Sequence, residues 1–76
     1  MAATKKSNLE QYHLDILQEL KSKGLKSCRN EDSDYLDENG NKRYGVNIEN
    51  QSGDVLDYEY FNKENEAIEF INELNN

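Results

Sequence analysis

The sequence contains no proline or tryptophan, and it has one cysteine, one histidine and one methionine in 76 residues. Because Cys28 is alone, neither an intrachain disulfide nor a thiolate metal cluster can form, and a reducing compartment is the simpler expectation. The chain has no uninterrupted apolar run, so we expect neither a secretory signal nor a transmembrane helix. These features favour a cytoplasmic protein without a membrane partner, acting in the bacterial host cytoplasm if its source is viral.

Catalytic and metal-binding motifs are also missing. There is no glycine-rich phosphate loop, no nucleophile elbow and no paired motif for acid–base work. His13 lies in an apolar stripe without a second ligand at metal spacing, so we interpret it as a packed core residue. The acidic run at residues 31–38 fails the calcium-loop pattern, because Gly40 in the glycine position puts Tyr35 and Val46 at ligand positions. We expect no enzyme activity, no cofactor and no metal site.

Carboxylates are in excess, with sixteen acids against nine bases and a net charge of −7. The first 29 residues hold six bases and three acids, a charge of +3, and the last 47 hold three bases and thirteen acids, a charge of −10. Concentrated like charge weakens a compact state, so this asymmetry indicates docking onto a positive partner. The shortage of bases argues against direct binding to nucleic acid.

Two helices are expected, one near each end. Ser7 followed by Glu10 is a capping-box pattern that predicts a helix start, and Gly24 is expected to end this helix. Its apolar stripe consists of Leu9, Tyr12, His13, Ile16, Leu17 and Leu20. Asn62 is expected to cap the second helix. The apolar face of that helix consists of Ala67, Ile68, Phe70, Ile71 and Leu74.

Antiparallel strands are expected between the helices, because apolar and polar residues alternate over residues 44–49 and 56–60. Asn39 and Gly40 predict a hairpin that pairs residues 33–38 with residues 42–48. Whether Tyr35 or Leu36 points inward stays open. Residues 25–29 are a candidate edge strand.

The register of the last hairpin decides which side chains face outward. A two-residue turn at Ser52 and Gly53 would place Ile48 opposite Asp57. A three-residue loop at 51–53, with a left-handed Gly53, places Ile48 opposite Leu56 and is the register we prefer. It also sets Val46 opposite Tyr58. The outer sheet face would then consist of Asn47, Glu49, Asp57 and Glu59.

These elements predict a two-layer α+β fold in the order helix, three to four antiparallel strands, helix, with both helices on one face. We expect residues 7–76 to form a single domain and residues 1–6 to be flexible.

The acidic residues would form a regular surface in this arrangement. Alternate residues of a strand lie about 6.6–6.8 Å apart on one face, so carboxylates could stand in for phosphates in a DNA-binding groove. The candidate partner-binding residues are Glu31, Asp32, Asp34, Asp37, Glu38, Glu49, Asp57 and Glu59.

In length, in charge and in its acidic rows at residues 31–38 and 49–59, the chain resembles small acidic phage proteins that mimic DNA. That class includes inhibitors of HU-type nucleoid proteins, of restriction enzymes and of CRISPR effectors. The resemblance implies a non-enzymatic inhibitor that blocks the DNA-binding surface of a basic bacterial protein, most plausibly one of the HU type.

An alternative hypothesis is a homo-oligomeric adaptor or regulatory subunit whose acidity only confers solubility. Leu14 on the polar side of the first helix and exposed strand edges would favour a homodimer.

Overall fold

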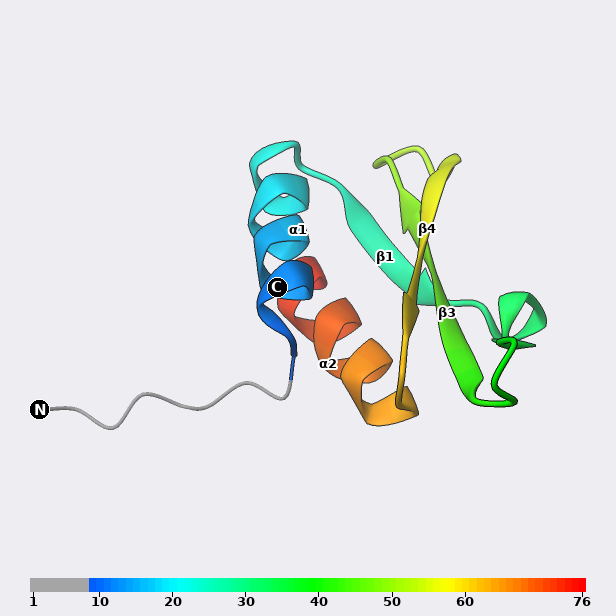
Figure 1. The fold of residues 1–76 in the computed structure, drawn as a ribbon. Coiled ribbons are helices and arrows are strands. Elements are labelled where there is room, and N and C mark those ends of the chain that lie inside the picture. Colours follow the sequence, from blue (N-terminus) through cyan, green and yellow to red (C-terminus); the bar gives the residue numbers. More distant parts are fainter. Residues whose placement is uncertain (1–8) are drawn as a thin grey trace, which may run out of the picture.

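The computed structural model describes residues 9–76 and consists of two helices and a four-stranded antiparallel sheet (Figure 1). The elements in chain order are α1 (Gln11–Ser22), β1 (Lys26–Arg29), the 3-10 turn η1 (Glu31–Ser33), β2 (Tyr35–Leu36), β3 (Lys42–Glu49), β4 (Val55–Phe61) and α2 (Glu64–Asn75). This order confirms the predicted α+β fold. The capping residue Ser7 and the expected flexible segment 1–6 lie outside the described residues.

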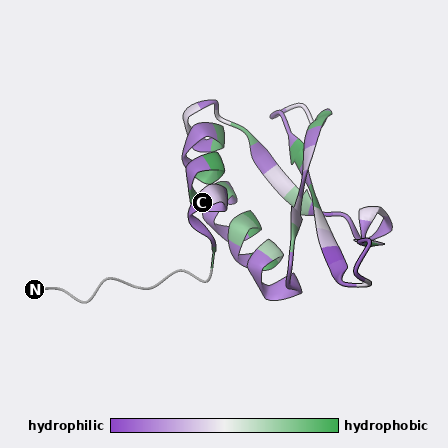
Figure 2. Ribbon diagram, in the orientation of Figure 1, coloured by the Kyte–Doolittle hydropathy of each residue, from purple (hydrophilic) through white to green (hydrophobic). Residues whose placement is uncertain are grey.

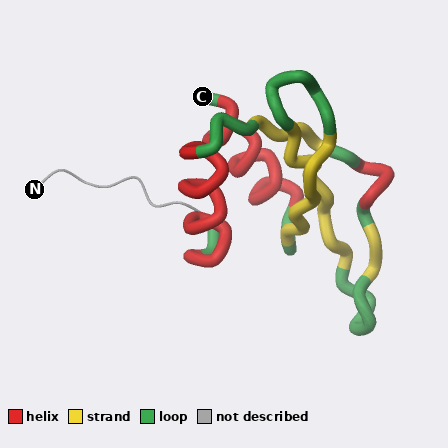
Figure 3. Tube along the Cα trace, turned by 90° about the horizontal axis from the view of Figure 1, so that it is seen from above, coloured by secondary structure: helices red, strands yellow, loops and turns green. Residues whose placement is uncertain are grey.

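The sheet is built around β3, with which all three other strands pair. Both helices lie on the same side of the sheet, as Figures 1 and 3 show from two directions. Val46, Ile48 and Phe61 from the sheet and Phe70 from α2 are the largest fully buried side chains. Burying each of them contributes about 1.5–3 kcal/mol. The core therefore lies between the sheet and the two helices.

Helix α1 begins at Gln11, later than the capping-box pattern predicts, because Glu10 is the extended N-cap residue. The middle of the predicted stripe is buried, but Tyr12 is 64% exposed. Leu14 was expected on the polar side and instead packs against the core. Tyr12 and Leu14 flank the stripe on opposite sides, so tertiary packing rather than helix periodicity decides which of them is covered.

The end of α1 follows the prediction. Gly24 has a φ of +70°, and the N–H groups of Gly24 and Leu25 donate to the carbonyls of Lys21 and Leu20. Two such bonds satisfy helix-end carbonyls in a glycine-terminated cap.

Helix α2 begins one residue later than predicted, with Lys63 rather than Asn62 at the N-cap. Ala67, Phe70 and Leu74 are buried as expected, whereas Ile68 remains exposed.

At its C-terminal end, α2 is tied to the sheet through Asn75. The Asn75 side-chain amide accepts a hydrogen bond from the Ser27 N–H and donates one to the Ser27 carbonyl. It therefore satisfies backbone groups of the edge strand β1.

The loop of the β3–β4 hairpin forms as predicted, but the strand register beyond the loop differs from the prediction. Gly53 has a φ of +91°, and the Asn50 N–H donates to the Asp54 carbonyl, as a three-residue loop requires. Glu49 lies opposite Val55, and after a bulge Ile48 lies opposite Asp57. The predicted pairing of Ile48 with Leu56 is therefore wrong.

Leu56 is the extra residue of this bulge, and it reverses the facing of the rest of β4. Val46 pairs with Glu59, not with Tyr58 as predicted. Because directly opposed residues share a face, Asp57 and Glu59 lie on the helix side and Tyr58 on the outer side. This register buries Phe61, which has no hydroxyl group to satisfy, and leaves the tyrosine hydroxyls nearer to water.

The hairpin at Asn39 and Gly40 forms, although β2 spans only two residues. Tyr35 pairs with Arg43, and Gly40 has a φ of +80°. Tyr35 and Leu36 are both exposed, so neither enters the core. The Tyr35 ring packs edge-on against Tyr60.

Candidate interaction surface

Two of the predicted partner-binding residues hold the fold together instead. Asp34 accepts two hydrogen bonds from the Arg29 guanidinium, at 2.7 and 2.8 Å, and one from the Gly45 N–H at 2.7 Å. The Arg29 bonds are the main cause that lowers the pKa of Asp34 to about 2. This carboxylate fixes η1 against β3 and is not available to a partner.

Asp37 has the same kind of role in the β2–β3 hairpin. Its carboxylate accepts hydrogen bonds from the backbone N–H groups of Asn39 and Asn41, both at 2.9 Å. Arg43 donates to it at 3.1 and 2.8 Å. The backbone bonds, the one from Asn41 first, lower the pKa of Asp37, and the Arg43 side chain adds to that effect. Asp37 therefore stabilises the turn.

Glu59 is turned toward the helices by the bulge and lies next to His13. Its side chain is 17% exposed, and its Oε1 is 3.7 Å from His13 Nε2. Burial raises the pKa of Glu59, and the charge of Asp57 adds to the increase. Burial lowers the pKa of His13, whose ring packs against Phe61 at 4.2 Å between centroids. His13 is thus a core residue, and Glu59 is not part of an outer acidic surface.

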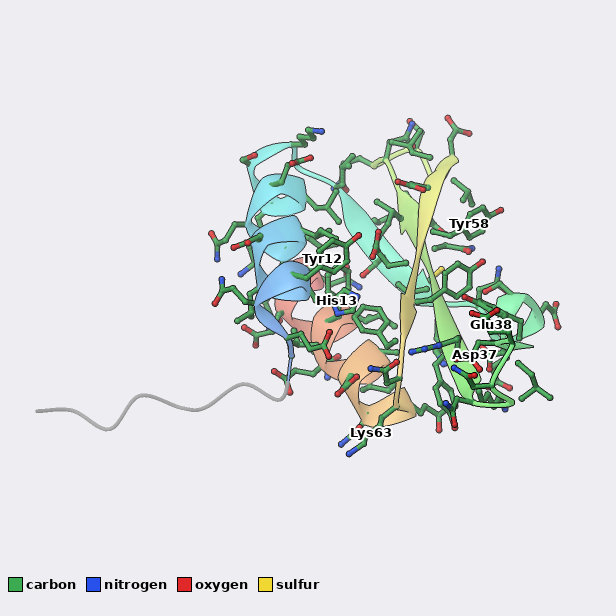
Figure 4. The ribbon with its side chains drawn as sticks, viewed as in Figure 1. Tyr12, His13, Asp37, Glu38, Tyr58 and Lys63 are labelled. Carbon is green, nitrogen blue, oxygen red and sulfur yellow. The ribbon has the colours of Figure 1, made fainter. Side chains whose placement is uncertain are left out.

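The other predicted acids remain at the surface. Glu31, Asp32, Glu38 and Asp57 are exposed, and Glu49 is half-buried. None of these five forms an ion pair within residues 9–76. The predicted regular surface of carboxylates is wrong. Glu31 and Asp32 lie on η1 and Glu38 lies in the β2–β3 turn, whereas Asp57 lies on the helix side of the sheet. Figure 4 shows Glu38 on the hairpin, on the far side of the sheet from the helices.

Glu49 has a local partner on β1. Its Oε2 accepts a hydrogen bond from the Cys28 thiol at 3.0 Å. This bond is the main reason that the pKa of the exposed Cys28 is raised. A raised pKa reduces the thiolate fraction, so Cys28 is a poor nucleophile at neutral pH.

The exposed charges in the described part of the chain are mostly negative. Ten of the sixteen carboxylates are exposed. Only four of the seven bases in residues 9–76 are exposed, and all four are lysines. These are Lys21, Lys23, Lys42 and Lys63. The arginines, Arg29 and Arg43, are partly covered and bonded to carboxylates of the same chain. A partner would therefore meet a strongly negative surface.

Sequence reasoning missed an apolar feature at the start of β4. Val55, Leu56 and Tyr58 are 43%, 56% and 47% exposed. Figure 2 shows hydrophobic residues at this end of β4, and in Figure 4 Tyr58 projects away from the helices. We call these three side chains the β4 patch. The strand was recognisable from the sequence, but its exposed side depended on the bulge at Leu56, for which the sequence has no clear signal.

Among residues 9–76, no three His, Cys, Asp or Glu side chains are placed to hold a metal ion together. Neither α1 nor α2 is long and apolar enough to cross a bilayer. The chain matches no protein-family model, no curated protein and no solved structure.

Proposed function

We propose that this chain is a non-enzymatic inhibitor that binds the DNA-binding surface of a basic bacterial protein and blocks DNA from it. A cytoplasmic nucleoid protein of the HU type is the first partner to test. The observation that carries the proposal is the excess of ten exposed carboxylates over four exposed lysines. Such a surface attracts a basic protein from a distance and repels nucleic acid.

The carboxylates that act in this proposal differ from the predicted set. Asp34, Asp37 and Glu59 are occupied within the fold, so the attraction of the partner comes from carboxylates without an ion pair, such as Glu31, Asp32 and Glu38. Regular spacing along one strand is not required, because long-range attraction depends on the summed field of many charges. The mimicry is therefore one of net charge and field rather than of phosphate spacing.

The direct experiment is a displacement assay. A labelled DNA duplex bound to purified HU-type protein is titrated with the chain, and release of the DNA is followed by fluorescence anisotropy. We expect release at low salt and weaker release as salt rises, because screening shortens the reach of exposed charges. Retention of the DNA at a large excess of the chain, at low salt, contradicts the proposal for this partner.

A matched variant separates charge from fold in that assay. The triple substitution E31Q/D32N/E38Q removes three exposed carboxylates without touching the bonded Asp34 and Asp37. We expect an unchanged melting temperature and weaker displacement. The substitution E73Q on the exposed side of α2 is a single-charge control.

A second function, the homo-oligomeric adaptor, would use the exposed apolar side chains of the β4 patch, against the repulsion between like carboxylates of two copies. Large side chains exposed side by side on one strand are typical of protein contact sites. Sedimentation velocity over a range of concentrations tests it, since a dimer would appear as a faster species. Partner binding that survives about 0.5 M salt would favour this function over the inhibitor, because exposed charges are screened there beyond a few ångströms.

A further inference from the structure

The β4 patch combines an apolar centre with an acidic surround. Glu49 lies directly opposite Val55, and Asp54 directly precedes Val55 in the chain. Neither carboxylate forms an ion pair within residues 9–76. Lys26 pairs with Glu49 by register across β1 and β3 but makes no ion pair with it. The patch is therefore an exposed tyrosine and two aliphatic side chains beside two carboxylates, Glu49 and Asp54, that have no ion-pair partner.

Several hydrogen bonds hold the backbone under this patch in place. The Asn50 side chain accepts from the Asp54 N–H at 3.0 Å and donates to the Asp54 carboxylate at 3.2 Å. The Gln51 side chain donates to the Gly24 carbonyl at 2.6 Å, which ties the loop to the end of α1. A surface ordered before binding loses less entropy when a partner docks.

Strand addition is opposed at this edge of the sheet. The Leu56 bulge interrupts the regular ladder, and the Asp57 carboxylate accepts a hydrogen bond from the Tyr58 N–H at 2.8 Å. Bulges and charges at an edge hinder pairing with another strand. A partner would therefore dock through side chains rather than through the backbone.

A second copy of this chain is also opposed. A two-fold contact centred on the patch would bring like carboxylates of the two copies together, and like charges across an interface are unfavourable. A partner bearing cations has the complementary charge. The acids that surround the patch therefore select a basic protein over a homodimer.

The chain itself shows how an arginine fits such a site. Arg29 lies over the ring of Tyr44, with its Cζ 5.4 Å from the ring centroid, while it bonds Asp34 in a bidentate pair. Tyrosine faces attract cations, and carboxylates accept the planar guanidinium fork. Tyr58, with Glu49 on the same outer face of the sheet, offers the same two kinds of group to an external arginine.

We propose that the β4 patch is the short-range docking site for an arginine-bearing surface of a basic partner protein. Tyr58 is the central contact, and Val55 and Leu56 cover the aliphatic part of the arginine side chains. This inference rests on the proposed function for its partner class. It adds that one face of the molecule, and not its whole acidic surface, makes the close contact.

Amide mapping tests the location without any assumption about DNA. The uniformly 15N-labelled chain is titrated with a short polyarginine peptide, and amide shifts are followed by NMR. Because the sequence has no proline, every residue after the first carries a backbone amide N–H. We expect the largest shifts at residues 54–58 and at Glu49. Shifts spread evenly over the exposed acids of η1, α1 and α2 would overturn the inference. The displacement assay tests the proposed function independently of this mapping. The proposed function and the location of the docking site can therefore fail separately.

Substitutions at Tyr58 test the chemistry. Tyr58→Leu is expected to weaken polyarginine binding about fivefold, whereas Tyr58→Phe, which keeps the ring, is expected to change it less than twofold. Ile68→Ala on α2 removes a comparably exposed apolar side chain away from the patch and serves as the control. Equal affinity for Tyr58→Leu and the unmodified chain, with the fold verified by circular dichroism, would overturn the inference.

Discussion

Residues 31–38 and residues 54–59 are both rich in carboxylates, but the fold uses them differently. In the first segment, Asp34 and Asp37 bond to Arg29 and Arg43 and shape the backbone, while their neighbours remain free. In the second segment no carboxylate bonds to an arginine, and a bulge turns Glu59 inward and leaves Asp57 exposed. The density of acids along the sequence therefore does not define an acidic surface; the positions of arginines and bulges do.

The largest effect is expected from a substitution that removes the bonded acid Asp34 of the first segment. Asp34→Ala should lower the free energy of unfolding by about 3 kcal/mol, because it removes the bidentate partner of Arg29 and leaves the Gly45 N–H without its acceptor where little water reaches. The side chains of Arg29 and Asp34 are 14% and 10% exposed. Urea denaturation measures the change.

The neighbouring free acid provides the control for that experiment. Asp32→Ala should change the free energy of unfolding by less than about 0.5 kcal/mol, as is usual for exposed positions. Similar losses for the two variants would show that the two acids are not used differently.

A smaller, local effect is expected at the hairpin turn. Asp37→Asn removes the charge that accepts from Asn39, Asn41 and Arg43, so the turn should open more often. Hydrogen exchange at the Asn39 and Asn41 amides should accelerate, while Glu38→Gln at the exposed turn should leave it unchanged. Unaltered exchange in Asp37→Asn would contradict a structural role for this carboxylate.

The stability of the protein should depend on pH in opposite directions through Asp34 of the first segment and Glu59 of the second. The folded-state pKa of Asp34 is about 2, below its ordinary 3.8, so its contribution is complete above pH 3.8 and is lost as pH falls toward 2. The pKa of Glu59 is raised from 4.5, so the folded state holds its proton longer and stability falls as pH rises above 4.5.

Single substitutions separate the pH-dependent contributions of Asp34 and Glu59 to stability. Glu59→Gln should stabilise the protein at neutral pH, and the gain should shrink as pH falls to about 4.5. Asp34→Asn should reduce the loss of stability that occurs between pH 4 and pH 2. Melting temperatures across this range measure both, and a Glu59→Gln variant that is less stable than the unmodified chain at neutral pH would contradict the assigned direction.

A small effect on stability is expected from deleting Leu56. The deletion removes the extra residue of the bulge and leaves Ile48 opposite Asp57, so the core around Phe61 should be unchanged. Stability should stay within about 1 kcal/mol, because Leu56 is 56% exposed. A collapse of the fold on this deletion would show that the bulge has a structural role.

Local signals in the sequence were sufficient for most of the fold. Gly24, Gly40 and Gly53 adopt the left-handed backbone that their turns require, and the apolar spacing located both helices to within a few residues. The register of β4 was not predictable in this way. The three-residue loop was right, but the bulge at Leu56 arises because tertiary packing buries Phe61.

The candidate site was less predictable than the fold. Which acids are bonded depends on contacts between segments, such as Arg29 from β1 with Asp34 after η1, and neither charge pattern nor spacing reveals these pairs. Glu31, Asp32 and Glu38 were recognised as exposed acids because they lie in a polar loop region. Val55 and Leu56 were missed because an apolar pair in a strand is usually buried.

Inhibition by this chain requires that its exposed negative surface compete with DNA for a basic protein. The most direct test is the affinity of the chain for HU-type protein, measured by calorimetry over a series of salt concentrations. We predict an affinity that falls steeply as salt rises, together with displacement of DNA at low salt. No measurable affinity at low salt, or an affinity that does not change with salt, would contradict the account.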